Sequence, residues 1–341
     1  MDLLTFNPNG IYCSQADLYI DPWRPVERAL ITHGHSDHAR YGHKHYLCTE
    51  TAAPVIRHRL GDIKLQTIPF GKKVTVNGVD FSFHPAGHIL GSAQIRVAYK
   101  GEVWVASGDY KLEQDGLAEA FEPIPCHSFI TESTFGLPVY TWQDQESIFE
   151  EINDWWRQCQ AAGKVAVLSG YSLGKAQRIL RGLDPSLGPI FTHTAVENIN
   201  RIIRQQGYDL PVTQQVRPEM KKPDFVGGIV VAPPAALNSP WIKRFQPHSL
   251  GIASGWMRLR GARRRRAADR GFVLSDHADW PDLNKAIAAT GASRVFVTHG
   301  YTSIFSKWLN EQGYDAQVVE TRFEGELNEI NESTQAAEKS E

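Results

Sequence analysis

Apolar positions in the first 135 residues fall into short runs that end in turn residues, a pattern typical of β-strands. These runs cover 29–32, 73–76, 80–84, 94–99, 102–106 and 128–131. Helical spacing of apolar residues is scarce over the same stretch. The sequence therefore predicts a first part that is rich in β-structure.

After residue 140 the spacing changes, and helices alternate with strands. Apolar residues recur at helical spacing over 143–162, and Gly163 favours a helix end there. The later segments read in turn as strand or helix: 165–168, 175–183, 190–191, 196–206, 228–232, 271–274, 282–290 and 294–298. This alternation predicts parallel βαβ units.

Together these patterns predict a β-rich domain that an α/β insertion interrupts. We expect residues 1–163 and 270–323 to form the interrupted domain and 164–269 to form the insertion. Residues 324–341 contain six Glu and one Lys and no aromatic residue, so we expect a solvated, acidic, disordered tail.

The composition excludes several classes of protein. No run approaches the roughly 18 to 20 apolar residues of a membrane span, and the first residues lack the features of a signal peptide. We therefore expect a cytoplasmic protein without membrane contact. Cys13, Cys48, Cys126 and Cys159 form no C-x-x-C pair, which argues against disulfides and a cysteine zinc site and favours thiols in the core.

The charge is unevenly distributed along the chain. Lys and Arg number 36 against 38 Asp and Glu, a net charge of −2. The segment 324–341 alone carries −5, so the remaining residues carry +3 and are mildly basic. Seven arginines lie between Arg258 and Arg270. Such a run suits a polyanionic partner, and the alternative is a solvated face.

The densest group of metal-binding residue types directly follows the run 29–32. His33, His35, Asp37 and His38 lie within six residues. Side chains at alternate positions of an extended backbone project to the same side. His33 and His35 can therefore bind one cation while Asp37 and His38 turn toward a second. The alternative is a surface cluster of histidines.

Two neighbouring cations need further ligands and a bridging group. His88, Asp109 and His299 each follow or end a strand-like run and have a glycine beside them. Nitrogen and oxygen ligands without thiolate suit Zn²⁺ best and also accept Mn²⁺. We expect two divalent ions that lower the pKa of a water to about 7, so that hydroxide becomes the nucleophile.

The leaving oxygen of a hydrolysed ester needs a proton donor. His277 is the best unassigned histidine for this role, because an imidazole of ordinary pKa, about 6.5, can give up a proton at pH 7. The alternative is a capping or packing role. We expect His84, which lies four residues before His88, to be structural.

The order of these residues resembles a known enzyme family. Asp21, the loop 33–38, His88 and Asp109 are similar to the first four motifs of the metallo-β-lactamase fold. The later residues Glu132, His277 and His299 are similar to motifs A, B and C of its β-CASP branch, whose members are nucleases of RNA and DNA.

The resemblance extends over about residues 9–322 and is closest to the bacterial ligase-associated DNA exonucleases. The segments that carry it are 9–13, 18–23, 33–38, 87–92 and 253–279. It implies an α/β fold in which a metallo-β-lactamase αββα sandwich holds an inserted α/β β-CASP domain. It also suggests association with a DNA ligase or helicase.

The same resemblance implies a role for each residue. One zinc would be held by His33, His35 and His88, and the other by Asp37, His38 and His299, with Asp109 as the bridge. Asp37, Asp109, His277 and Glu132 would be catalytic, with Glu132 orienting His277. Asp21 would orient the loop 33–38, called the metal loop below, without itself binding a metal. The alternatives are a turn residue for Asp21 and a cap for Glu132.

The insertion contains candidates for contact with a nucleic acid. A strand, a small-residue turn and a helix start at 165–177 would place Ser172 and Lys175 beside free backbone N–H groups, where a phosphate can bind. The alternative is a packed turn with Ser172 as the cap. Tyr171 and Trp256 could stack on bases. The full expected contact set is Ser172, Lys175, Ser275, Arg258, Arg260, Arg263, Arg264, Arg265 and Arg266.

These features favour a metal-dependent DNA exonuclease that acts in DNA repair by means of a hydroxide activated by two zinc ions. The first alternative is an RNA-processing β-CASP ribonuclease, although Gly255-Trp256-Met257 stands where such enzymes often carry Pro-Gly-Met. The second is a hydrolase of small thioesters or lactams, which would not need the long insertion. A scaffold without activity is disfavoured, since every expected ligand position is filled.

Overall fold

The structure is a computed structural model and describes residues 2–259, 261 and 268–322. These form two compact units, the first from 2–141 and 276–322 and the second from 142–275. The second unit is thus an insertion in the first. It begins before residue 164 because helix α2 (Gln145–Ala161) packs on strand β12 (Val165–Ser169). The expected acidic tail lies outside the described residues.

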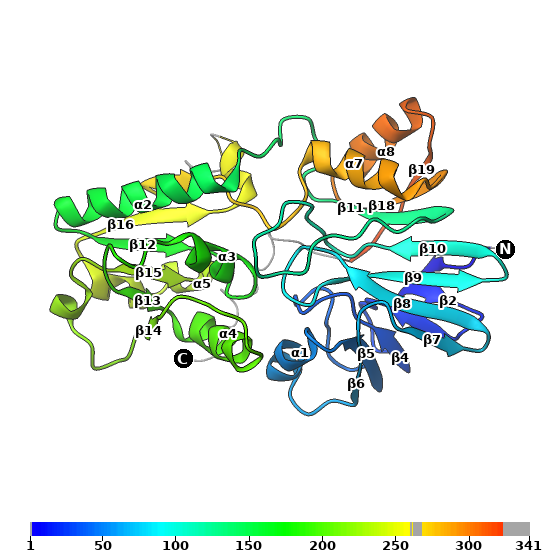
Figure 1. Ribbon diagram of the computed structural model, residues 1–341, viewed down its shortest axis with the longest axis horizontal. Coiled ribbons are helices and arrows are strands. Elements are labelled where there is room, and N and C mark those ends of the chain that lie inside the picture. The colour runs from blue at the N-terminus through cyan, green and yellow to red at the C-terminus, as the bar shows by residue number, and fades with distance from the viewer. Residues whose placement is uncertain (1, 260, 262–267, 323–341) are drawn as a thin grey trace. The chain divides into compact units, whose positions relative to one another are not determined.

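The first unit contains two sheets (Figure 1). The first sheet consists, in spatial order, of β1 (Thr5–Asn7), β2 (Gly10–Cys13), β3 (Leu18–Ile20), β4 (Arg28–Leu30), β5 (His45–Thr49) and β6 (Leu65–Ile68). The second consists of β19 (Asp315–Val318), β18 (Arg294–Gly300), β11 (Ser128–Ser133), β10 (Glu102–Ala106), β9 (Ala93–Tyr99), β8 (Val79–Pro85) and β7 (Lys73–Val76).

The core of this unit lies between the two sheets. Ile11 and Leu18 from the first sheet pack in one buried cluster with Phe81, Phe83 and Trp104 from the second. Helix α1 (Ala53–Leu60) covers the outer face of the first sheet, whereas α7 (Trp280–Thr290) and α8 (Thr302–Glu311) cover the outer face of the second. The layers are therefore helix, sheet, sheet, helix, which confirms the predicted sandwich.

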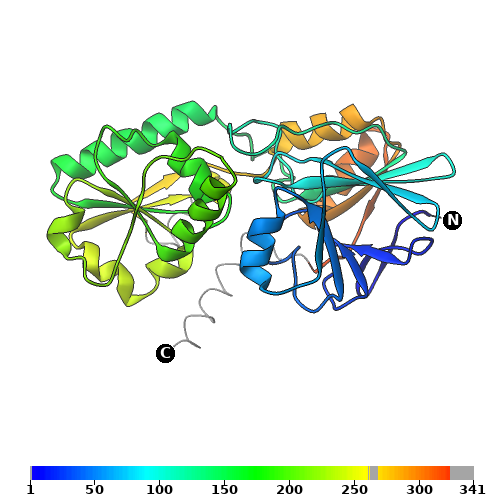
Figure 2. The same ribbon diagram turned by 60° about the horizontal axis from the view of Figure 1, so that its bottom comes forward.

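The second unit is a parallel α/β layer structure (Figure 2). Its strands lie in the order β14 (Gln214–Gln215), β13 (Ile190–Thr192), β15 (Ile229–Ala232), β12, β16 (His248–Ala253) and β17 (Arg270–Phe272). Its other elements are α3 (Lys175–Gly182), α4 (Thr194–Gln205), α5 (Pro234–Leu237), η1 (Lys222–Phe225), η2 (Pro240–Phe245) and η3 (Gly255–Arg258). Because β17 pairs with β16, this unit extends past the expected boundary at 269.

All four cysteines are buried and free, as the spacing predicts. Within the described ranges, the structure contains no helix of the length and apolarity that crossing a bilayer requires.

Candidate metal centre

Loops at the ends of several strands bring the expected ligands together in the first unit. The segment 33–38 follows β4, His88 lies between β8 and β9, Asp109 follows β10, and His299 lies near the end of β18. Gly108 lets the Asp109 turn come close to the loop, because its φ is +59° and an added Cβ would lie 2.8 Å from Thr32.

The first cluster of ligand atoms consists of three imidazoles and a carboxylate. His35 Nδ1 lies 3.2 Å from His33 Nε2 and 3.0 Å from His88 Nε2. Asp109 Oδ2 lies 3.6 Å from His33 Nε2 and 3.9 Å from His88 Nε2. One ligand atom from each of the four residues falls within 4.8 Å of the others.

The second cluster is formed by Asp37, His38 and His299, all of them buried. His38 Nε2 lies 3.7 Å from Asp37 Oδ2 and 3.5 Å from Asp109 Oδ2. Asp109 Oδ1 lies 3.7 Å from His299 Nδ1. The Asp109 carboxylate therefore faces both clusters, which is the position that a bridging ligand requires.

The hydrogen bonds of the ring nitrogens fit metal ligation. His88 Nδ1 donates to the Asp276 carbonyl at 2.8 Å, so a neutral ring presents the lone pair of Nε2 to the first cluster. The Thr32 hydroxyl donates to Asp21, and His33 Nδ1 therefore donates to Thr32 Oγ1 at 3.0 Å. Buried lone pairs that converge beside a carboxylate suit a divalent cation.

The pKa values of the first cluster favour the same state. Burial holds the pKa of His33 and of His88 well below the usual range, and neighbouring histidines add to this. Both rings are thus neutral, as a metal ligand must be. Burial by itself raises the pKa of Asp109. The neighbouring His38 and His299 lower it by more, so that the Asp109 pKa lies well below its usual range.

Asp21 lies behind the metal loop at a position with φ +42°. Its Oδ2 accepts from His38 Nδ1 at 2.7 Å, and its Oδ1 accepts from the Thr32 amide at 2.8 Å. Such outer carboxylates fix the tautomer and orientation of a ligand imidazole. This geometry is the one that the predicted orienting role needs.

The His277–Glu132 pair lies next to the first cluster. His277 Nδ1 is 2.9 Å from Glu132 Oε2, and the His277 and His88 rings are 4.5 Å apart. Glu132 also accepts from the Tyr110 amide at 2.7 Å and from the Thr134 hydroxyl at 2.5 Å. Glu132 therefore fixes the His277 ring with its Nε2 directed away from Glu132.

Ser133 holds the backbone that presents His299. This histidine has φ +55°, in the left-handed region that only a few per cent of residues other than glycine adopt. The Ser133 hydroxyl lies 2.5 Å from the His299 carbonyl, and the Ser133 backbone closely approaches Gly300. The surrounding structure thus enforces an uncommon ligand backbone, as functional sites often do.

No role was predicted for Ser92 and Thr32, which support the ligands. Ser92 Oγ accepts from the amides of His88 and Ile89 at 3.1 and 3.2 Å, and so fixes the turn that presents His88. Thr32 links Asp21 to His33 as described above. Ser92 is the last residue of the segment 87–92, one of those that carry the family resemblance, and this position could have indicated its role. His84 instead contacts Ser82 and Glu122.

The expected nucleic-acid contacts in the second unit differ in accessibility. Ser172 is half-buried and Arg258 is exposed, whereas Lys175 and Ser275 are 0% and 3% exposed. The N-cap of α3 is Gly174, so the alternative of Ser172 as the cap is wrong. The remaining expected contacts, Arg260, Arg263, Arg264, Arg265 and Arg266, lie outside the described residues.

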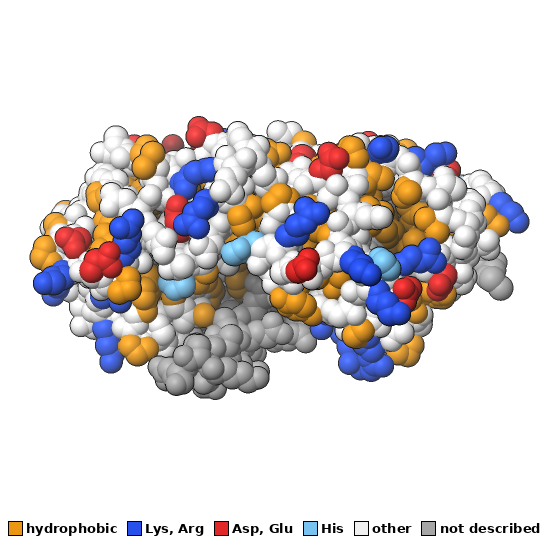
Figure 3. Space-filling model, turned by 90° about the horizontal axis from the view of Figure 1, so that it is seen from below, with side chains coloured by type: hydrophobic (Ala, Val, Ile, Leu, Met, Phe, Trp, Pro, Cys, Tyr) orange, Lys and Arg blue, Asp and Glu red, His pale blue; other side chains and the backbone are white. Residues whose placement is uncertain are grey.

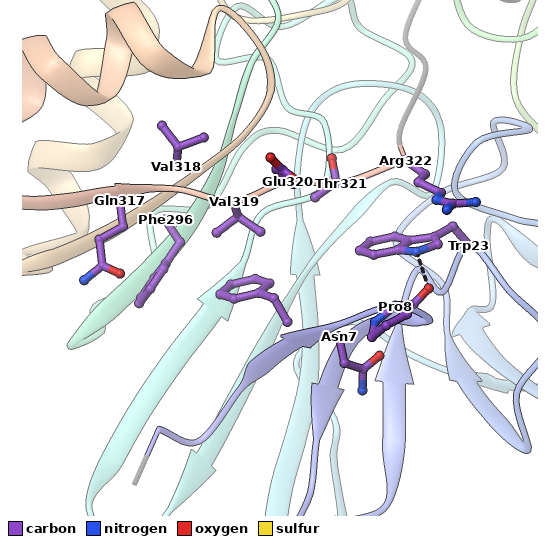
Figure 4. Close-up of a pocket in the computed structure, with 11 residues that line it drawn as sticks. Asn7, Pro8, Trp23, Phe296, Gln317, Val318, Val319, Glu320, Thr321 and Arg322 are labelled. Carbon is purple, nitrogen blue, oxygen red and sulfur yellow. Dashed lines mark hydrogen bonds between the residues drawn. The ribbon is translucent and has the colours of Figure 1, made fainter.

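A cavity of about 500 Å³ lies in the first unit between the start of the chain and the segment after β19 (Figure 4). Phe6, Trp23 and Phe296 line it, and Trp23 is fixed by a 2.8 Å bond from its Nε1 to the Pro8 carbonyl. Arg322 also lines the cavity. The space-filling view of the molecule from below shows several Lys and Arg side chains on the half that belongs to the first unit, with acidic and apolar side chains among them (Figure 3).

The buried His43, which follows the metal loop, should make the stability of the protein depend on pH. Its Nε2 is buried with no hydrogen-bond partner among the described residues, and burial lowers its pKa to about 4. The unfolded chain therefore takes up a proton near pH 6.5 that the folded protein does not accept until about pH 4. Above pH 6.5 the neutral His43 ring makes its whole contribution to the free energy of unfolding. This contribution declines as the pH falls to about 4, by at most about 3 kcal/mol.

We expect His43→Gln to remove this decline. Urea denaturation of metal-free protein between pH 7.5 and 4 should show wild type losing more free energy of unfolding than the variant. Parallel curves for the two proteins would show that His43 does not carry this dependence.

Comparison with known proteins finds similarity over nearly the whole chain. A protein named probable DNA ligase, from Opitutus terrae, is 32% identical over 326 residues, which is 94% of this chain and 31% of the relative. The chain therefore spans about a third of that relative. No protein-family model matches the chain.

Other relatives match a shorter stretch. Endoribonuclease YSH1 of Eremothecium gossypii is 30% identical over 123 residues, 36% of this chain and 16% of the relative. Cleavage and polyadenylation specificity factor subunit 3-I of Arabidopsis thaliana is 32% identical over 126 residues, 36% of this chain and 18% of the relative. A solved structure of a protein of unknown function from Enterococcus faecalis has a TM-score of 0.60 at 11% identity and covers 87% of this chain and 80% of its own. It supports the fold alone.

Proposed function

We propose that this chain, which belongs to the metallo-β-lactamase/β-CASP superfamily, is a metal-dependent exonuclease that hydrolyses phosphodiester bonds of DNA in repair. The observation that carries the proposal is the convergence of seven ligand side chains in two clusters that share Asp109. The His277–Glu132 pair lies beside them. Two adjacent metal sites and a nearby proton donor are parts that metal-assisted ester hydrolysis can use.

The residues of the two clusters would hold one divalent ion each, and their nitrogen and oxygen donors suit Zn²⁺. When bound, such ions neutralise phosphate charge and lower the pKa of water. His277 would give a proton from Nε2 to the departing oxygen. Glu132 would keep that ring oriented and stabilise its charged form, because it accepts from Nδ1.

The match to a probable DNA ligase supports DNA as the substrate, because it extends over 94% of the chain. It also supports an association with a DNA ligase, and we propose a ligase or helicase as partner. The relatives with RNA-processing names match only 36% of the chain. RNA is therefore the second candidate substrate.

End-labelled oligonucleotides of matched sequence test the proposal. Single- and double-stranded DNA and RNA would be incubated with Zn²⁺, Mn²⁺ or no added metal, and the products resolved by length. We expect faster cleavage of DNA that shortens progressively from an end and requires metal. Equal or faster cleavage of RNA would overturn the choice of DNA, and internal cuts would overturn the exonuclease assignment.

The arginine run predicts how binding depends on salt. Replacing Arg263, Arg264, Arg265 and Arg266 with Ala should weaken DNA binding. The slope of log K against log salt concentration should become shallower by about one unit for each lost phosphate contact. Fluorescence anisotropy with labelled DNA at several salt concentrations measures both quantities. An unchanged slope would show that these arginines do not contact DNA phosphates and would favour the alternative of a solvated face.

A further inference from the structure

Two arginines hold the metal loop from outside, at backbone carbonyls rather than at ligand side chains. Arg59 Nη1 donates to the Gly34 carbonyl at 2.5 Å, and Arg40 Nε donates to the Asp37 carbonyl at 3.0 Å. The loop's own backbone bonds instead converge on His35, whose carbonyl accepts from two amides. The arginines therefore restrain the backbone at Gly34 and Asp37, whereas the loop's own backbone bonds restrain it at His35.

A tyrosine hydroxyl anchors the backbone of each arginine. Tyr41 OH donates to the Arg59 carbonyl at 2.8 Å, and Tyr46 OH donates to the Arg40 carbonyl at 2.9 Å. Arg40 also donates from Nη2 to the carbonyl of Arg322, which lines the cavity of Figure 4, at 2.7 Å. The tyrosines thus anchor the backbone of both arginines, and the Arg40 guanidinium is held by two carbonyls, which fixes the direction of its bond to the Asp37 carbonyl.

We propose that Arg59 and Arg40 are positioning residues of the metal centre, each governing one of its two ion sites. Gly34 connects His33 and His35, which belong to the first cluster, so Arg59 fixes the spacing of that pair. Asp37 belongs to the second cluster, so Arg40 fixes the backbone that presents its carboxylate. The inference rests on the proposed metal centre and adds which residues outside the ligand set maintain it.

The positive charge of these arginines cannot itself attract a metal cation. Their contribution is therefore geometric, and losing a partner that orients metal ligands commonly lowers metal affinity by about 10- to 100-fold. An arginine that acted only on the phosphates of a substrate would change nucleic-acid binding and leave metal affinity unchanged. Metal affinity measured without nucleic acid separates the two roles.

The test compares Arg59→Ala and Arg40→Ala with wild type and with Arg57→Ala. Arg57 is the matched control, because it is exposed, lies on the same helix α1 and donates to the Leu65 carbonyl at 3.2 Å instead of to the metal loop. Metal-free proteins would be titrated with Zn²⁺ in competition with a chromophoric chelator. A parallel Co²⁺ titration would distinguish the imidazole-rich first site from the second by its absorption spectrum.

We expect Arg59→Ala to weaken binding at the first site by about 10- to 100-fold and Arg40→Ala to weaken the second by a similar factor. Arg57→Ala should match wild type, and Arg59→Lys should recover part of the lost affinity. Wild-type affinity at both sites in both Ala variants would overturn the proposal. Weakening of the same site by both variants would overturn the division between the two arginines.

Two controls keep the result interpretable. The thermal midpoints of the metal-free variants should match wild type, and if an Ala variant does not fold, the Lys variants at both positions carry the test. Wild type that binds no metal would overturn the proposed function, whereas normal binding by folded variants of a metal-binding wild type would overturn only the positioning roles.

Discussion

Asp109→Ala is expected to abolish both metal binding and DNA cleavage. The Asp109 carboxylate is 3.6 Å from a nitrogen of the first cluster and 3.5 Å from one of the second. Its removal would take a ligand and the compensating negative charge from both sites at once. We expect fewer than one tightly bound ion per chain after dialysis and no cleavage above background.

Elemental analysis of dialysed protein and a labelled-DNA assay measure these two losses. Asp80→Ala serves as the control, because Asp80 lies on β8 and bonds to Lys73 and Thr75. Retention of two ions by Asp109→Ala would show that this carboxylate does not bridge the centre.

His277→Ala is expected to retain both metal ions and to lose about 10²- to 10⁴-fold in the rate of cleavage. Its ring lies beside His88 and is held by Glu132, but it is not one of the seven ligands of the two clusters. The loss should therefore appear in kcat at saturating DNA. Glu132→Gln should have a smaller effect of the same kind, since an amide can still accept from Nδ1 but carries no charge.

Single-turnover cleavage across pH, together with elemental analysis, distinguishes this role from a structural one. Removal of the proton donor should eliminate the decline in rate that wild type shows as the pH rises and the donor loses its proton. An unchanged turnover in His277→Ala would remove the proton-donor assignment, and loss of metal would instead make His277 a part of the metal centre.

The sequence predicted most strands of the second sheet, which have strong apolar patterns, and of the first sheet only the run that overlaps β4. The runs 102–106 and 73–76 coincide with β10 and β7. Strand β6 was missed because only Ile68 of its four residues is buried. Helix α1 was missed because eight residues with a proline in the first turn are too few to show helical spacing.

The site was predictable where its residues are dense in the sequence. The loop 33–38 carries four candidate ligands within six residues, and this density indicated that His88, Asp109 and His299 are ligands too. The partnership of Glu132 with His277 came only from the family resemblance, because 145 positions separate them. Arg40 and Arg59 left no pattern at all, since they act on backbone carbonyls that any residue provides.

Anomalous diffraction at the zinc absorption edge, from crystals grown with Zn²⁺, tests the central claim most directly. We predict two peaks per chain on either side of Asp109. One should lie among the side chains of His33, His35 and His88, and the other among those of Asp37, His38 and His299. A map of well-ordered crystals with no peak at either position would contradict the proposed metal centre and the hydrolytic function that depends on it.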